Sequence, residues 1–180
     1  MSIVSCVIFQ HQFSHNQFLY QKSDLIITRR DFVIEEQPGL FSQLTIRNLE
    51  NKKRKITIDW QSRVNIRPAW RSDLTNDIDI ISYHQGLIKA SDASQLGEKL
   101  ISGSITPPVK HELDENLATL SYSLDLPAKG ESSISFLFLK LGSDADNQKF
   151  LQTFDQQSQL LEQKARTYRE IAFDGVQFSC

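Results

Sequence analysis

Apolar and polar residues alternate along much of the first two-thirds of the chain, as they do in β-strands that bury one face. Every second residue of Lys55–Trp60 is apolar. Gln43–Arg47 repeats this pattern, and the polar stretch Asn48–Lys53 lies between the two segments. We therefore expect the two segments to form an antiparallel hairpin that is closed by this polar turn.

A second hairpin is predicted further along the chain. Leu120–Leu126 alternates between apolar residues and serine or aspartate, and Pro127–Gly130 has the residue types of a turn. The return segment Ser133–Leu139 begins in alternation and ends almost continuously apolar, which predicts burial on both faces. Seven further segments have a weaker strand pattern: Val4–Phe9, Gln17–Tyr20, Leu25–Thr28, Phe32–Glu35, Ile80–Tyr83, Leu87–Ala90 and Lys99–Ser102.

About ten short strands separated by turn residues predict a mainly β fold. Two packed antiparallel sheets are the usual solution for such a pattern. We therefore predict a two-sheet antiparallel β-sandwich of the supersandwich kind.

The pattern changes after residue 142. No proline or glycine occurs from Ser143 to the residue before Gly175, and Ser143 or Asp144 can cap a helix. We predict one long helix over Asp144–Ile171, which at ~1.5 Å per residue would be roughly 40 Å long and cross a domain of this size. Its apolar residues follow a spacing of three or four with a polar interruption: Phe150, Phe154, Leu161, Ala165 and Tyr168.

The sequence thus divides into three parts. Residues 1–142 form the predicted sandwich domain, residues 143–173 a linker helix packed on it, and residues 174–180 the extended start of a following domain. A length of 180 residues is enough for one domain with a substantial core.

Charge and hydropathy argue against several kinds of partner. The formal net charge of −2 gives no electrostatic reason to expect nucleic acid or an anionic membrane, and the basic run Lys52–Lys55 fits a solvated hairpin tip. No segment approaches the ~20 apolar residues that span a bilayer. The N-terminus lacks a basic leader and a cleavage site, so the compartment stays open, with the cytoplasm favoured.

Catalytic signatures are missing from the sequence. It has no G-x-S-x-G nucleophile motif and no glycine pattern for a phosphate or dinucleotide, so we expect no cofactor. Cleavage of a glycosidic bond needs two converging carboxyl groups. Glu35 and Glu36 are neighbours in a predicted strand and point to opposite faces. Asp77, Asp79 and Asp92 fit solvated turn carboxylates better than a catalytic pair.

Two histidines have the spacing of metal ligands on a helix. His11 and His15 are four residues apart, but their polar flanks predict a turn between strands, and no third ligand is near in sequence. We interpret them as surface or hairpin histidines and expect no metal site.

Aromatic side chains are the remaining residues with which the chain could contact a sugar. Trp60 lies on the apolar stripe of its strand, so we assign it to the core. Trp70 follows Arg67 in a segment that does not alternate. We favour a role in structural packing for Trp70, with stacking on a sugar ring as the alternative. The candidate carbohydrate-contact residues are Arg67, Trp70 and Tyr83.

The segment Asn65–Asp73, with the sequence NIRPAWRSD, carries a resemblance to a known family. It resembles a motif of the N-terminal β-sandwich in glycoside hydrolases whose catalytic domain is an (α/α)6 barrel, above all the glycogen-debranching (amylo-α-1,6-glucosidase-like) and trehalase-like group. The segments 44–58, 86–104, 126–138 and 160–169 are similar to the flanking hairpins, strands and linker helix of that family, in the same order. Arg71 departs from the pattern, since an apolar residue is expected there.

The resemblance, which covers about residues 31–180, implies a non-catalytic role. The acid and base of such enzymes reside in the barrel, so no catalytic residue carries over to this chain. It implies a non-catalytic accessory domain that packs on an (α/α)6 barrel in cis and shapes the cleft of an enzyme acting on α-glucan-type or related oligosaccharides. Two alternatives stay open: a stand-alone carbohydrate-binding module with Trp70, Tyr83 and Tyr122 as stacking residues, and a protein-interaction sandwich unrelated to sugar.

Overall fold

The computed structural model describes residues 6–11, 15–33, 39–66, 79–92 and 99–140. Secondary structure in these ranges is β-structure throughout, and the part described holds no helix with the length and apolarity to cross a membrane. The predicted helix at 144–171 lies outside the described residues. The strands are β1 (Cys6–His11), β2 (Asn16–Lys22), β3 (Leu25–Val33), β4 (Gly39–Asn48), β5 (Arg54–Arg63), β6 (Ile80–His84), β7 (Leu87–Ser91), β8 (Lys99–Gly103), β9 (Lys110–Asp114), β10 (Leu117–Leu126) and β11 (Glu131–Lys140).

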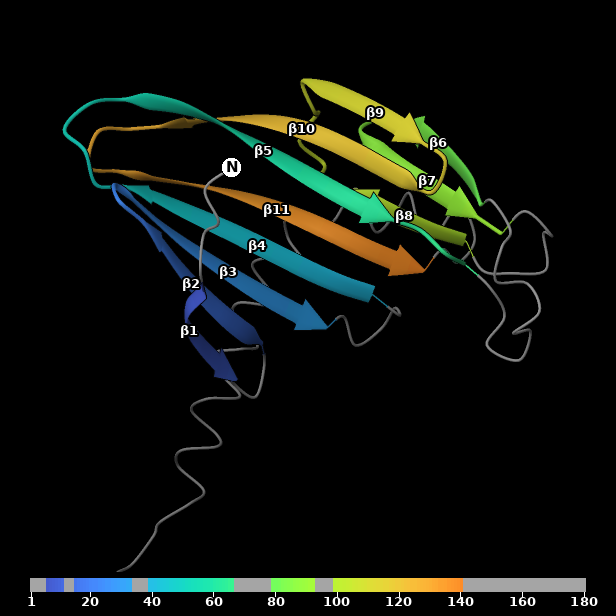
Figure 1. The fold of residues 1–180 in the computed structure, drawn as a ribbon, viewed down its shortest axis with the longest axis horizontal. Coiled ribbons are helices and arrows are strands. Elements are labelled where there is room, and N and C mark those ends of the chain that lie inside the picture. The colour runs from blue at the N-terminus through green and yellow to red at the C-terminus, as the bar shows by residue number, and fades with distance from the viewer. Residues whose placement is uncertain (1–5, 12–14, 34–38, 67–78, 93–98, 141–180) are drawn as a thin grey trace, which may run out of the picture.

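The strands form two antiparallel sheets, which confirms the predicted sandwich (Figure 1). The larger sheet has eight strands in the order β1-β2-β3-β4-β11-β8-β7-β6, and the smaller has three in the order β5-β10-β9. Two strands that the pattern separated, Leu25–Thr28 and Phe32–Glu35, are joined in the single strand β3 as far as Val33. Strand β9 was not predicted.

Both predicted hairpins are wrong, because the two strands of each belong to different sheets. β4 pairs with β3 and β11 in the larger sheet, whereas β5 pairs with β10 in the smaller one. The turns at residues 49–53 and 127–130 therefore carry the chain across the sandwich. Two strands that face each other across a core also bury every second residue. The apolar–polar alternation is therefore the same for two strands of a hairpin and for two strands in opposite sheets.

Asn48 joins the two crossings at one end of the sandwich. Its fully buried side chain donates from Nδ2 to the carbonyl oxygens of Lys52 (2.8 Å) and Pro127 (2.9 Å). Its Oδ1 accepts from the backbone N–H of Glu50 at 3.1 Å, and its own N–H donates to the carbonyl of Gly130 at 2.8 Å. One amide thus supplies the partners that the buried backbone of both turns needs.

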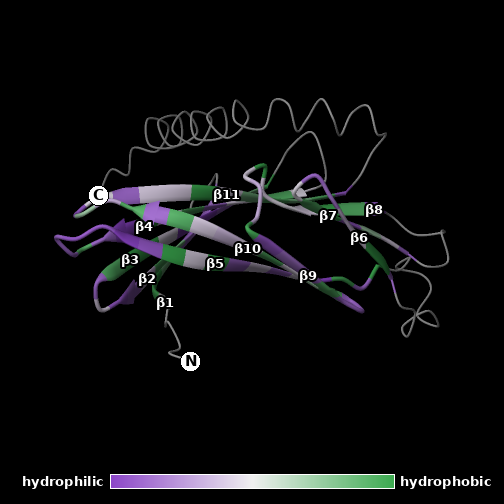
Figure 2. Ribbon diagram, turned by 90° about the horizontal axis from the view of Figure 1, so that it is seen from above, coloured by the Kyte–Doolittle hydropathy of each residue, from purple (hydrophilic) through white to green (hydrophobic). Residues whose placement is uncertain are grey.

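The core lies between the two sheets. Apolar and polar residues alternate along β5 and β10, and the more buried residues alternate in the same way (Figure 2). Trp60 stacks on Phe136 with ring centroids 4.3 Å apart, which confirms its predicted place in the core. Its Nε1 donates to the Oγ of Ser102 at 2.8 Å, so its polar atom is satisfied there. The buried centre of this cluster consists of Ile88, Ala118, Leu120, Tyr122, Ile134 and Phe136.

Part of the outer face of the larger sheet is also apolar and buried. Leu137 and Leu139 alternate with Phe136 along β11, so they point away from the smaller sheet. β11 is therefore buried on both faces at Phe136 and Leu137, as predicted, whereas Phe138 is exposed. The outer-face apolar side chains, each at most 3% exposed, are Phe32, Phe41, Ile101, Leu137 and Leu139.

Candidate functional site

One candidate site lies where the edge strands β6 and β9 of the two sheets meet. The ring of Tyr83 stacks on that of His111, with centroids 3.9 Å apart and planes at 7°. Tyr83 is half-buried against the core, whereas His111 is exposed. Because His111 covers one face of the Tyr83 ring, a ligand at this edge would meet the imidazole first.

The other aromatic candidates differ in their outcome. Tyr122 is buried, and its hydroxyl accepts a hydrogen bond from the backbone N–H of Ser104 at 3.1 Å. Burial raises the pKa of Tyr122 to about 12. Its interpretation as a sugar-stacking residue is wrong, since a ring inside the core cannot meet a ligand. Arg67 and Trp70 lie outside the described residues.

Two of the candidate carboxylates are buried. Asp79 is buried, and its Oδ2 accepts from the backbone N–H of Ile66 at 2.7 Å. The N–H of Asp79 in turn donates to Oδ1 of Asn116 at 3.2 Å. Asp92 is buried as well. The prediction of solvated turn carboxylates is therefore wrong for both, while residues 35, 36 and 77 lie outside the described part of the chain.

The two histidines near the first turn are in different environments. His11 is exposed, and its Nδ1 lies 2.7 Å from Oδ1 of Asn16. His15 is buried with its ring centroid 5.0 Å from that of Phe32, so of the two expected positions it has the one between paired strands, β1 and β2, and not the surface one. Among the described residues, no group of three His, Cys, Asp or Glu is placed to hold a metal ion.

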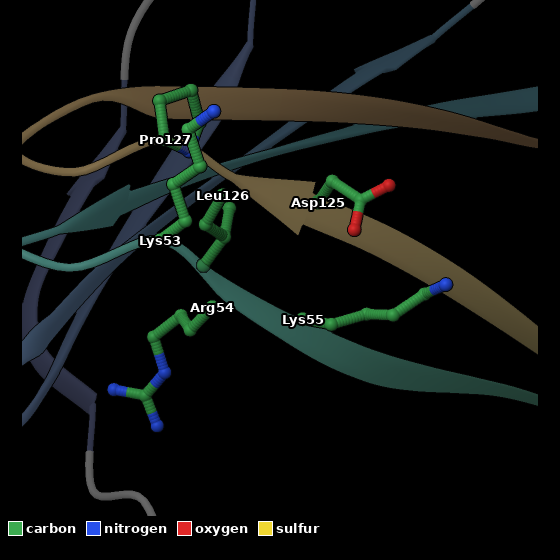
Figure 3. A pocket seen from close by; sticks show the side chains of 6 residues that line it. All are labelled: Lys53, Arg54, Lys55, Asp125, Leu126 and Pro127. Carbon is green, nitrogen blue, oxygen red and sulfur yellow. The ribbon is translucent and has the colours of Figure 1, made fainter.

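An open pocket of about 580 Å³ lies at the end of the sandwich where the chain crosses between sheets (Figure 3). The guanidinium of Arg54 is turned away from Lys55 and Asp125 in Figure 3, and it pairs with Asp24 and, at 3.8 Å, with Glu50. The lysines here are exposed, as predicted for a solvated tip, and such charges bind anions weakly. The lining residues are Lys53, Arg54, Lys55, Asp125, Leu126 and Pro127.

A further surface on β1, β2 and β3 was missed by the sequence analysis. The rings of Phe9 and Phe18 lie 5.0 Å apart, and the guanidinium carbon of Arg29 is 5.5 Å from the Phe18 ring centroid. Strand register brings these side chains together, and register depends on pairing that the sequence does not show. The surface, called the β1–β3 platform below, consists of Phe9, His11, Asn16, Phe18, Arg29 and Asp31.

Comparison with known proteins defines the class of fold. No protein-family model matches the sequence, and no curated protein matches it. Two solved structures with a similar fold are carbohydrate-active enzymes. One is described as "Putative kojibiose phosphorylase from human microbiome" (TM-score 0.53, 14% identity, 84% of this chain). Another is the polysaccharide lyase BACCELL_00875 (TM-score 0.52, 11% identity, 72% of this chain).

These likenesses concern the fold, because the identities are low. This chain spans 21% of the phosphorylase chain and 22% of the lyase chain. The matches therefore show a β-sandwich fold that also occurs within these two longer chains.

Proposed function

We propose that this chain is a non-catalytic N-terminal accessory domain of a glycoside-active enzyme that acts on α-glucan-type or related oligosaccharides. The observation that carries the proposal is the match to the phosphorylase chain over 84% of this chain but 21% of that one. The order of family-like motifs along residues 31–180 supports the same conclusion. In this role the domain shapes one wall of the substrate cleft of an (α/α)6 barrel that follows in cis.

The proposal places the helix predicted at residues 143–173 on the outer face of the larger sheet. Support comes from the apolar side chains of that face, which are at most 3% exposed although the smaller sheet packs on the opposite side. A helix with an apolar residue every three or four positions matches such a face. This packing would connect the sandwich firmly to the barrel.

Sequencing the coding DNA beyond the codon of Cys180 tests the proposal first. We expect an open frame of several hundred codons that encodes a helical-repeat domain. In the resulting enzyme, deletion of residues 1–142 should lower the melting temperature and kcat/KM, because a packed partner and a cleft wall are lost. The chain of residues 1–180 should not cleave kojibiose, trehalose or maltooligosaccharides. A stop codon after Cys180, or turnover by this chain, would contradict the proposal.

A further inference from the structure

The larger sheet extends beyond the edge of the smaller one. Strand β5 forms that edge, and its Ile56 and Ile58 belong to the same hydrophobic cluster as Leu25 and Ile27 of β3. Strands β1 and β2 continue the larger sheet past this edge (Figure 1). The face that forms the core under the smaller sheet is therefore open to solvent on these outer strands.

Strand register places the β1–β3 platform on this open inner face. Phe18 pairs with Arg29, and Arg29 with Leu44. Leu44 packs against the core, so its partners in the same row point to the same side. Phe9 ends the row, and it is 56% exposed. The platform is thus an extension of the core face that the smaller sheet does not cover.

Its aromatic part has the form of a stacking surface. Phe9 and Phe18 stand on adjacent strands with their ring planes at 39° and their centroids 5.0 Å apart. Phe9 is exposed and Phe18 is half-buried, and aromatic rings that lie together on a sheet offer a large apolar contact area at low entropic cost. The C–H face of a pyranose ring is a ligand surface that fits such a pair.

Its polar part is fixed before any ligand binds. Nε of Arg29 donates to Oδ1 of Asp31 at 2.8 Å, and a second guanidinium nitrogen lies 2.8 Å from Oδ2. The Oγ of Ser42 donates to the same carboxylate at 2.7 Å. Two of the five Arg29 donors are used in this pair, so the others are held in a defined direction for hydroxyl groups. Because the carboxylate offsets the charge of Arg29, the site favours a neutral ligand.

Asn16 and His11 extend this polar row toward the edge strand. Asn16 pairs with Asp31 in register, and His11 pairs with Asn16. The contact between His11 Nδ1 and Asn16 Oδ1 at 2.7 Å does not use the amide nitrogen of Asn16 or Nε2 of His11. Within the described residues neither atom has another hydrogen-bond partner, so both can meet sugar hydroxyls beside the aromatic pair.

We infer that the β1–β3 platform binds a neutral oligosaccharide, with a pyranose ring against Phe9 and Phe18 and its hydroxyl groups on Arg29 and Asn16. The choice of a sugar rests on the proposed function, which the inference deepens by giving the accessory domain a substrate-holding surface. The other surfaces formed by the described residues give less support for a ligand site. The arginine of the pocket at the crossings, Arg54, is paired with Asp24, and one face of the Tyr83 ring is covered by His111.

Titration of the 180-residue chain by ¹H–¹⁵N NMR tests the inference. The probes are maltoheptaose, cellohexaose and kojibiose, with trigalacturonic acid as a charged comparison. We expect saturable shifts confined to β1, β2 and β3 with at least one neutral probe. Phe9→Ala should weaken that binding at least about tenfold, because hot-spot aromatic contacts contribute this much. The matched control is Phe138→Ala, which removes another exposed phenylalanine (37%) from the same face on β11 and should leave the affinity unchanged.

Three outcomes would overturn the inference: no saturable shift with any neutral probe, binding of trigalacturonic acid alone, or equal weakening by Phe9→Ala and Phe138→Ala. If Phe9→Ala does not fold, Arg29→Gln serves in its place, since the spectrum of each variant also reports its fold. The proposed function is tested separately by the coding sequence beyond Cys180. A long open frame with no sugar binding would refute the platform alone, whereas sugar binding with a stop codon would leave the platform in a free-standing module.

Discussion

Single polar groups decide how the two sheets hold together. Tyr122 places its hydroxyl among apolar side chains, where one hydrogen bond from the N–H of Ser104 satisfies it. The side-chain amide of Asn48 donates to backbone carbonyls in two turns, those of Lys52 and Pro127. Buried groups of this kind stabilise the fold only while they keep their partners and their protonation state.

The stability of the protein should fall as the pH rises from 10 to 12. Burial raises the pKa of Tyr122 to about 12, above its usual value near 10, so the unfolded chain releases this proton first. The contribution of the protonated Tyr122 hydroxyl to the free energy of unfolding is complete below pH 10. About 2 kcal/mol of it is lost as the pH approaches the pKa of the folded state. Urea unfolding at several pH values should show a steeper decrease for the wild type than for Tyr122→Phe. Parallel curves for the two proteins would contradict this assignment.

Replacement of the Asn48 side chain should be strongly destabilising. Asn48→Ala leaves the carbonyls of Lys52 and Pro127 and the N–H of Glu50 without their buried partner. We expect a loss of about 3 kcal/mol in the free energy of unfolding, measured with urea. Arg47→Ala, at an exposed neighbouring position, is the control and should change stability by less than about 0.5 kcal/mol. Equal effects of the two substitutions would rule out a special role for Asn48.

At the scale of elements, the alternation predicted the strands but not their partners. Burial of every second residue in β5 and β10 follows from one core-facing side, whichever strand lies beside it. Strand β9 was missed because all of its residues are exposed, so it has no one-sided apolar pattern. The β1–β3 platform was missed because the alternation does not show which strands pair, and its residues meet only once the pairing of three strands is known.

A cross-linking experiment separates the observed pairing from the predicted hairpin. Thr57 and Ser123 are directly opposite each other on β5 and β10, so Thr57→Cys with Ser123→Cys should form a disulfide under mild oxidation. In the predicted hairpin, a register that keeps the apolar residues of both segments on one face would instead place Thr45 opposite Thr57. Thr45→Cys with Thr57→Cys is therefore the matched control and should stay reduced. Both pairs are made with Cys6 and Cys180 replaced by serine and are measured by thiol titration. The opposite result would restore the hairpin.

For the whole molecule, the two faces of the larger sheet have separate roles in our proposals. The outer face carries the buried row Phe32, Phe41 and Leu137, while the platform lies on the inner face of the outer strands. A helix at 143–173 on the outer face therefore leaves the platform open. One sheet can in this way attach to a catalytic domain and hold a sugar at the same time, which a sandwich of two small sheets would not allow.

Removal of the C-terminal segment tests this arrangement directly. A chain that ends at Gly142 should lose stability on the order of 5 kcal/mol and bind the dye ANS, because the outer-face apolar side chains lose their cover. A chain that ends at Phe173 keeps the predicted helix and should match the 180-residue chain in both measurements. If the chain ending at Gly142 is as stable as the full chain, another segment covers the outer face and the helix lies elsewhere. Oligosaccharide binding by the chain ending at Gly142, wherever it still folds, should be unchanged, because the platform lies on the opposite face of the sheet.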